Sequence, residues 1–262
     1  MDKEIMQIAV TSKMSKLLRE LDIVEKYLNV NEYYKRYSGL IINYDSDKIP
    51  SDECIALDLP AFIKSNIPIR EKNNPCVAIV GEAPSRKDIQ RHLGQLSVGI
   101  TFGQHDLSYY LNQRVYDKVI NFYLNQGFDV YVTNLSKTLT YKETNGKYVP
   151  QPIPQNDESM IEELQDEFDF YKPCHIIWLG DSQWKKFIYG EAANNLHIDW
   201  TCFPHPSGSN NNAWMHLFKK HHMEALRCTK ENKYFYIVSM SNVLYEGNDG
   251  TLHTTLEIFE NK

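Results

Sequence analysis

The sequence lacks paired cysteines. Its five cysteines stand far apart, and no two of them form a C-x-x-C pair. A zinc ribbon or a disulfide framework would need such spacing, so the sequence indicates neither, and we expect no metal site. Isolated cysteines fit a reducing compartment best, so we expect the protein to be cytoplasmic.

Long apolar runs and several common enzyme motifs are also missing. No stretch approaches the roughly 20 apolar residues of a membrane span. The first ten residues, MDKEIMQIAV, do not have the pattern of a signal peptide. We therefore expect no membrane partner. The chain has no G-x-S-x-G elbow, P-loop or G-x-G-x-x-G segment, so no motif supports an unrelated α/β hydrolase or transferase.

Basic charge is scarce. The chain has 28 Lys and Arg residues against 34 Asp and Glu residues, which gives a net charge of −6. This balance argues against a protein that coats nucleic acid, but it allows an enzyme with a local basic groove. One stretch, residues 219–233, is rich in basic residues: Lys219, Lys220, Arg227, Lys230 and Lys233. A solvated helix face explains any single one of these charges equally well.

The hydrophobic content of 42% over 262 residues is that of an ordinary globular protein with a sizeable core. Four short apolar runs are typical of buried strands, at 76–80, 128–133, 175–179 and 200–203. Helical patterns alternate with them, at 107–126, 157–171, 181–189 and 213–228. This alternation predicts an α/β fold of three α/β/α layers around a central, mostly parallel four-stranded sheet.

The two ends of the chain differ from this pattern. Residues 1–74 are predicted to be an N-terminal helical extension packed on the core, because apolar residues recur at helical spacing from residue 3 to about residue 28. Residues 75–228 form the predicted α/β core. Residues 229–262 are predicted to be a C-terminal antiparallel hairpin, with strand-like segments at 234–239 and 252–259 around the turn signal Asn248-Asp249-Gly250.

Polar residues follow each of the four predicted central strands. Glu82, Asn134, Asp181 and His205 stand at or just after the strand ends. Ligands of parallel sheets bind at the carboxyl ends of the strands. The sequence therefore predicts a site at that edge of the sheet.

Four segments, three of which lie at the ends of these strands, follow one another along the chain. They are Gly81-Glu82-Ala83-Pro84, Gly99-Ile-Thr-Phe-Gly-Gln104, Val130-Tyr-Val-Thr-Asn134 and His205-Pro206-Ser207, with Leu179-Gly180 before the last. Together they resemble the uracil-DNA glycosylase superfamily over residues 75–228, and by motif the branch with G-E-A-P and H-P-S. The resemblance implies a monofunctional DNA glycosylase of base excision repair. Such an enzyme flips uracil or a related damaged base out of DNA and hydrolyses its bond to deoxyribose.

Two residues are candidates for holding the base. Phe102 would be the stacking platform, although a core Phe is the alternative. The amide of Asn134 presents a donor beside an acceptor. It matches the O4 and N3–H of uracil and would reject cytosine, where that pattern is reversed. An Asn that only closes a strand or caps a helix is the alternative.

Two further residues are candidates for chemistry. Cleavage leaves negative charge on the departing base, and His205, held between two prolines, could donate a hydrogen bond to the base oxygen. A His bonded to backbone in a tight turn is the alternative. Glu82 is the nearest carboxylate for orienting the attacking water, because the position used for this in the best-known relatives is Ala83 here. Glu82 could instead face a backbone amide and shape the loop.

The remaining implied contacts are to substrate and phosphate. The predicted binding residues besides Asn134 are Gly81, Ala83, Pro84, Ser85, Phe102, Gly103, Pro206 and Ser207. Short hydroxyls and backbone N–H groups suit DNA phosphates. Arg86 is expected either to add a phosphate contact or to be exposed, and Lys137 to meet phosphate or solvent.

The sequence departs from the resembled branch in two ways. The near-adjacent cysteine pair that its iron–sulfur members carry before the first motif is missing, so we expect no iron–sulfur cluster and no other cofactor. The loop after Ser207 reads Gly-Ser-Asn-Asn-Asn and offers no apolar wedge. This argues against prying bases out of a stable duplex. The expected partner is DNA with a damaged base, with single-stranded substrates, mismatches and a modified base all left open, and we expect a monomer. The alternative function is a catalytically weak or inactive nucleic-acid or nucleotide-binding module of the same fold.

Overall fold

Parallel strands form the centre of the molecule in the computed structural model, which describes residues 16–17, 19–22, 42–67, 74–86, 89–102, 114–153, 158–180, 197–223, 226–241, 244–246 and 252–254. The central sheet has the order β10-β9-β4-β6-β3. Its strands are β3 (Ala61–Ile63), β4 (Cys76–Gly81), β6 (Asp129–Asn134), β9 (His175–Leu179) and β10 (Asp199–Phe203). The four predicted strands are present and parallel, and β3 adds an antiparallel fifth strand at the β6 edge.

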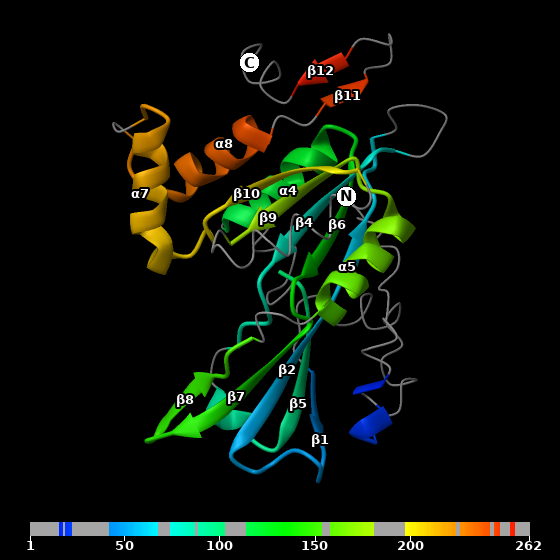
Figure 1. Ribbon diagram of the computed structural model, residues 1–262, viewed down its shortest axis with the longest axis vertical. Coiled ribbons are helices and arrows are strands. Elements are labelled where there is room, and N and C mark those ends of the chain that lie inside the picture. The colour runs from blue at the N-terminus through cyan, green and yellow to red at the C-terminus, as the bar shows by residue number, and fades with distance from the viewer. Residues whose placement is uncertain are drawn as a thin grey trace.

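Helices cover both faces of this sheet, as predicted for a three-layer fold (Figure 1). One face packs against α4 (Val115–Asn125), α7 (Asn211–Lys220) and α8 (Lys230–Ser241), and the other against α5 (Glu158–Tyr171). Successive residues of β4 alternate between the two faces: Val77 and Ile79 belong to the first core, Ala78 and Val80 to the second. Strands buried on both faces have almost continuous apolar runs, and these made the four strands recognisable.

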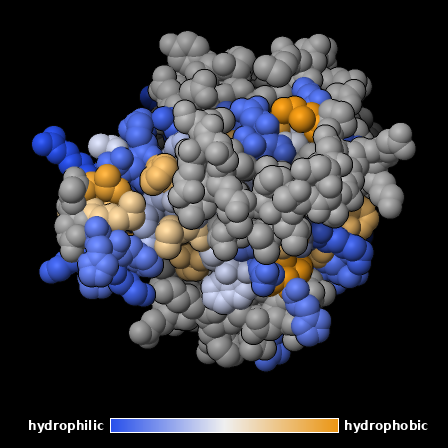
Figure 2. Space-filling view, turned by 90° about the horizontal axis from the view of Figure 1, so that it is seen from above, coloured by the Kyte–Doolittle hydropathy of each residue, from blue (hydrophilic) through white to orange (hydrophobic). Residues whose placement is uncertain are grey.

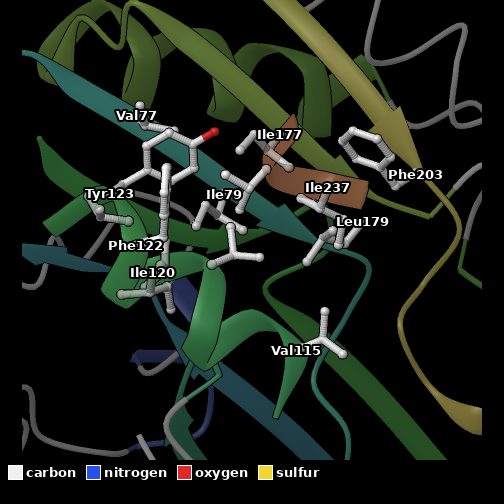
Figure 3. Packing of buried hydrophobic residues seen from close by; sticks show 14 of the residues in the cluster. Val77, Ile79, Val115, Ile120, Phe122, Tyr123, Ile177, Leu179, Phe203 and Ile237 are labelled. Atoms are coloured by element: carbon white, nitrogen blue, oxygen red, sulfur yellow. The ribbon is translucent and has the colours of Figure 1, made fainter. Parts of the chain in front are cut away.

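The larger of the two cores lies between the sheet and the helices α4, α7 and α8. Figure 3 shows Val77 and Ile79 of β4, together with Ile177 of β9, among the side chains of the helices. Tyr123 of α4 is fully buried there, with its ring edge-on to Phe128 at 5.7 Å between centroids. This packing fixes α4 on the sheet.

A second five-stranded sheet, which the sequence did not predict, has the order β1-β5-β2-β7-β8. Its strands are β1 (Ile42–Asp45), β2 (Glu53–Leu59), β5 (Gln95–Ile100), β7 (Thr138–Thr144) and β8 (Lys147–Pro150). The prediction of a helical extension is therefore wrong for residues 42–63, which form three strands. Within the described part of the predicted N-terminal helix, residues 16–17 and 19–20 are helical, and Leu17 and Leu21 pack on this sheet.

The second sheet begins where the central strands end. Only Pro60 separates β2 from β3, and three residues separate β6 from β7. Figure 1 shows the second sheet as the lower part of the molecule, continuous with the central sheet through these strands. The end of β6, at the predicted site edge, therefore adjoins the second sheet.

The C-terminal region also differs from the expectation. Residues 234–239, predicted to be a strand, lie within helix α8. Helix α7 ends at Lys220 and is followed by a turn at residues 221–222, so it is shorter than predicted. The aromatic and β-branched run at 234–239 favours a strand locally, but Tyr236, Ile237 and Val238 are buried against the central core as a helix. An antiparallel hairpin does follow, formed by β11 (Leu244–Glu246) and β12 (Leu252–Thr254). The turn signal between them lies outside the described residues.

The described elements include two single turns of 3₁₀-helix, η2 (Ile89–Arg91) and η3 (Gly208–Asn210). None of the described helices is long and apolar enough to span a bilayer. The predicted helix at 181–189 lies outside the described residues.

Candidate functional site

The first and third sequence motifs meet at the ends of two neighbouring strands. Gly81 of β4 and Asn134 of β6 are paired in the parallel register. The pairing continues past the strands, because the N–H of Leu135 donates to the Gly81 carbonyl and the N–H of Ser136 to the Glu82 carbonyl, both at 2.9 Å. Glu82 and Asn134 are therefore brought to the same edge of the sheet.

Gly81 lies against two predicted site residues. A Cβ atom on Gly81 would be 2.4 Å from Oδ1 of Asn134 and 3.0 Å from the ring of Phe102. Real Cβ atoms do not approach other atoms so closely, so only glycine fits here without a shift of its neighbours. Because Gly81 has no side chain, the Asn134 amide and the Phe102 ring can both lie against the end of β4.

Phe102 is held from both its ring and its backbone. The ring stacks on Tyr116 of α4, with 4.8 Å between centroids and 25° between planes. Its backbone has φ of 58°, and its carbonyl accepts a hydrogen bond from Arg114. Arg114 also pairs through two N–H groups with Asp117. The second motif therefore places Phe102 in a fixed, partly buried position.

The amide of Asn134 has a charged partner that sequence reasoning missed. Nδ2 of Asn134 donates to Oδ2 of Asp58 at 3.1 Å, across 76 residues of sequence. Asp58 is the second-last residue of β2 and is buried. A charged residue inside the otherwise apolar run Ile55-Ala-Leu-Asp-Leu59 was the available signal, because buried charges need partners.

Asp58 is paired in turn with Arg86. Nη2 of Arg86 lies 2.8 Å from Oδ1 of Asp58, and the Arg86 side chain is fully buried. Arg86 also donates to the carbonyls of Leu57 and Ser97 and to the Ser97 hydroxyl. The expectation that Arg86 contacts phosphate or is exposed is therefore wrong, since its donors are used inside the protein.

The first motif loop is tied to the second sheet. The hydroxyl of Tyr141 in β7 accepts a hydrogen bond from the Arg86 N–H at 3.1 Å and donates to the Pro84 carbonyl at 3.3 Å. Along this loop Pro84 is buried, Glu82 and Ala83 are half-buried, and Ser85 is exposed. Ser85 is therefore the loop residue that solvent reaches most freely.

His205 lies in the loop after β10, with its imidazole oriented by the next turn. The N–H of Ser207 donates to Nδ1 of His205 at 3.3 Å. A ring nitrogen that accepts a hydrogen bond carries no proton, so the neutral ring carries its proton on Nε2. The His205 carbonyl accepts from the indole N–H of Trp214 in α7. This ring can therefore act as a donor through Nε2.

Lys233 of α8 donates hydrogen bonds to the same loop. Its Nζ donates to the carbonyls of Pro206 and Ser207 and, at 2.7 Å, to Oδ1 of Asn211. Burial lowers the pKa of Lys233. Within the predicted basic stretch Lys233 is therefore a buried residue rather than a surface charge. Lys219, Lys220, Arg227 and Lys230 are exposed. Seen from above, the left side of the molecule, on which α7 lies in Figure 1, carries hydrophilic residues with some hydrophobic ones among them (Figure 2).

Lys137 also differs from its expectation of phosphate or solvent contact. Its Nζ lies 3.0 Å from a carboxylate oxygen of Glu167 in α5, and both side chains are 3% exposed. It donates as well to the Asn134 carbonyl at 2.7 Å. Burial raises the pKa of Glu167, and the neighbouring Lys137 opposes that shift. Lys137 therefore links α5 to the end of β6 on the face away from Phe102.

The strand order sets the width of the site. Between β6, which ends at Asn134, and β10, which precedes His205, lie β4 and β9. Three strand spacings of about 4.8 Å separate the two outer strands. The loop of Gly81, Glu82 and Ala83 stands between them. Gly103 and Asp181 lie outside the described residues.

Other features of the described residues do not add to this site. A cavity of about 230 Å³ lies between the N-terminal helical segment and α5, lined among others by Lys16, Ser136 and Glu163. Lys137 lines it, but none of the residues predicted to hold the base or to take part in the chemistry does. In the described ranges no group of three or more His, Cys, Asp or Glu side chains could hold a metal ion.

Comparison with known proteins yields one family. The family model described as "Uracil DNA glycosylase superfamily" matches residues 69–228, which is more than half of the chain. No curated protein matches the chain.

Proposed function

The chain belongs to the uracil DNA glycosylase superfamily, and from this premise we propose that it is a monofunctional DNA glycosylase that excises uracil or a closely related damaged base. The superfamily supports DNA glycosylase activity, base excision repair and DNA as the partner in general terms. The observation that carries the finer proposal is the joint position of Asn134 and Phe102 beside the missing side chain of Gly81.

A flipped pyrimidine ring would stack on Phe102 while the Asn134 amide reads its edge. Oδ1 would accept from N3–H of uracil, and an Nδ2–H would donate to O4. Cytosine has an acceptor at N3 and a donor at C4, so the same amide orientation rejects it. Asn134 is 2% exposed, so the pocket must open to admit a base.

His205 would stabilise the departing base. As the bond between C1′ and N1 breaks, its electron pair goes to the base, whose carbonyl oxygens then carry negative charge. The Nε2–H of His205 donates to one of these oxygens. A donor of this kind, preorganised in a dry site, is worth about 3 kcal/mol of barrier. The hydrogen bond from the Ser207 N–H supports this role, because it keeps the proton on Nε2.

Water completes the reaction by bonding to C1′ of the sugar. Glu82 stands at the end of β4, between Asn134 and the His205 loop in strand order. Its carboxylate would orient the water and take one of its protons, and the oxygen with the other proton remains on C1′. Reaction by this route needs no metal and no cofactor. Iron or acid-labile sulfide in the purified protein would contradict that part of the proposal.

A binding module that has lost the chemistry is the second candidate. Ala83 favours it, because that position holds no carboxylate, and so does the polar loop after Ser207. Such a module would hold a base between Phe102 and Asn134 without hydrolysing the bond.

A glycosylase assay separates the two candidates. Labelled single strands, duplexes and mismatched duplexes would carry uracil, hypoxanthine, xanthine or hydroxymethyluracil, with alkali to reveal abasic sites. We expect excision of uracil that falls about 100- to 1,000-fold in His205→Ala. The exposed His216→Ala, on α7, is the matched control and should keep full activity. Tight binding without excision anywhere in the panel would establish the binding module instead.

A further inference from the structure

The geometry points to Asp58 as the residue that sets which base the pocket accepts: we propose that Asp58, held by Arg86, locks the Asn134 amide in the orientation that selects uracil. This inference rests on the proposed function, since it concerns the base-reading step of the same site. Asp58 acts here through Asn134 and is a positioning residue.

An asparagine amide can turn over by 180°, exchanging its oxygen and its NH₂ group at little steric cost. Only its hydrogen-bond partners decide between the two orientations. An ionised carboxylate accepts hydrogen bonds and cannot donate them. Because Oδ2 of Asp58 lies 3.1 Å from the amide, the NH₂ group must face Asp58 and Oδ1 must face Gly81.

Arg86 holds the Asp58 carboxylate in place as the acceptor that orients the Asn134 amide. Its Nη2 lies 2.8 Å from Oδ1 of Asp58, and the two side chains are 0% and 4% exposed. A guanidinium has only donors and no acceptor, so the Asp58 oxygen beside it must be an acceptor. Gly99 makes room for the pair, because a Cβ there would be 2.9 Å from Arg86 Nη2 and 3.1 Å from Asp58 Oδ1.

The locked amide leaves one pattern for the base. Nδ2 has two hydrogens, and Asp58 needs only one of them; a base read by both ends of the amide takes the hydrogen beside Oδ1, which assigns the other to Asp58. The hydrogen beside Oδ1 and Oδ1 itself then form a donor–acceptor pair toward the base. Uracil complements this pair, and cytosine complements the turned-over amide. The base preference is therefore set by a charge in the second sheet, 76 residues before the residue that it orients.

The substitution Asp58→Asn gives a directional test. Arg86 can only donate, so it selects the oxygen of an asparagine at position 58. The NH₂ group of that side chain then faces Asn134, which must turn its own oxygen toward it. The turned amide matches cytosine. We expect uracil excision to fall about 10- to 100-fold, as when the partner that orients an active-site ligand is lost, and the uracil-to-cytosine ratio of kcat/KM to fall by at least about 10-fold.

Two controls separate this effect from general damage. Glu53→Gln makes the same carboxyl-to-amide change in the same strand, where the carboxylate pairs with Lys142, and should leave rate and ratio unchanged. The double variant Asp58→Asn with Arg86→Met removes the unpaired buried charge and keeps the test available if the single variant does not fold. Without Arg86 neither orientation of the amide at position 58 is selected. The uracil-to-cytosine ratio of kcat/KM of the double variant should therefore lie between those of the wild type and Asp58→Asn.

A second measurement does not depend on activity. In protein labelled with ¹⁵N-asparagine, the side-chain NH₂ signals of Asn134 are identified by their loss in Asn134→Ala. We expect one of the two protons to be shifted downfield and protected from solvent exchange in the wild type, and both effects to be lost in Asp58→Asn but kept in Glu53→Gln.

The outcomes are distinct. A wild-type protein that excises no uracil would remove the proposed function, and the NMR signals would then decide the orientation on their own. Active wild type with an unchanged ratio and unchanged Asn134 signals in Asp58→Asn would overturn the role of Asp58. A loss of rate at constant ratio, with unchanged signals, would also overturn it, because it would reveal only a structural contribution.

Discussion

The side-chain oxygen of Asn134 lies 2.4 Å from the point where a methyl group on Gly81 would be. The two residues are register partners on neighbouring strands, so the sheet holds their backbones side by side. The space beside Gly81 is therefore kept free by the glycine alone.

Gly81→Ala should consequently displace the amide and the ring of Phe102. We expect it to destabilise the protein by about 1–3 kcal/mol, as overpacking of a tight core does, and to lower uracil excision at least about 10-fold. Urea unfolding and single-turnover kinetics measure the two effects. Gly146→Ala in the β7–β8 turn is the control: its φ of 73° strains an alanine, but no atom lies within 4 Å of its Cβ position. Gly146→Ala should lose stability and keep activity. Equal losses of activity in Gly81→Ala and Gly146→Ala would contradict the role given to the space beside Gly81.

Lys233→Met should loosen the loop that carries His205. The substitution keeps most of the aliphatic chain, one atom shorter, but removes the hydrogen bonds of Nζ to the Pro206 and Ser207 carbonyls and to Asn211. We expect kcat to fall about 10- to 100-fold, as a small misplacement of a reacting group does, with little change in KM. Lys230→Met, an exposed position in the same helix, should change neither constant. A change confined to KM would instead assign Lys233 to DNA binding.

His175 should make stability depend on pH. Burial lowers its pKa to about 4, against an ordinary value of 6.5, although nearby Asp199 opposes the shift. The folded state therefore binds fewer protons than the unfolded state between these values, so stability rises with pH from about 4 to 6.5 and is lost as pH falls through that window. The full effect is about 3 kcal/mol. Urea unfolding at pH 4, 5, 6 and 7 should show a smaller loss in His175→Gln than in the wild type. Parallel pH profiles would refute this.

The buried pair of Lys137 and Glu167 should show strong coupling. Lys137→Met leaves the Glu167 carboxylate buried without its partner, and Glu167→Gln leaves the Lys137 ammonium buried without its partner. Each substitution should lower the free energy of unfolding by about 3–5 kcal/mol. The double variant should regain much of the loss, because it buries no charge. Urea unfolding of the four proteins measures the coupling. Losses that simply add would mean that the two charges do not depend on one another.

The central sheet could be predicted because its signal is local. Each of its parallel strands is a short apolar run, and β4, β6 and β9 are buried over their whole length. The register of β4 and β6 brings Gly81 and Asn134 together, whereas Phe102 reaches them from the end of β5, in the sheet that was not predicted. The roles of these residues, and of Glu82 and His205, stay predictions until activity is measured.

The second sheet could not be predicted because its partners are distant. In β2 only part of the strand is continuously buried, and its neighbours β5 and β7 follow some 40 and 85 residues later in the register. The prediction of a strand at 234–239 was wrong for a related reason, since the local preference of this segment for a strand gives way to its packing on α4 as a helix. Charge misled similarly: Arg86, Lys137 and Lys233 looked like surface cations, and each is buried with partners far along the chain.

The two residues that orient the site lie on either side of the family match. Asp58 precedes residue 69 and Lys233 follows residue 228, the limits of the match. A chain trimmed to those limits would retain every motif and yet lose both supports. Contacts of such long sequence separation close slowly and after the local elements, so we expect the site to be among the last parts of the molecule to form during refolding. During refolding, recovery of helical structure should therefore precede recovery of uracil excision.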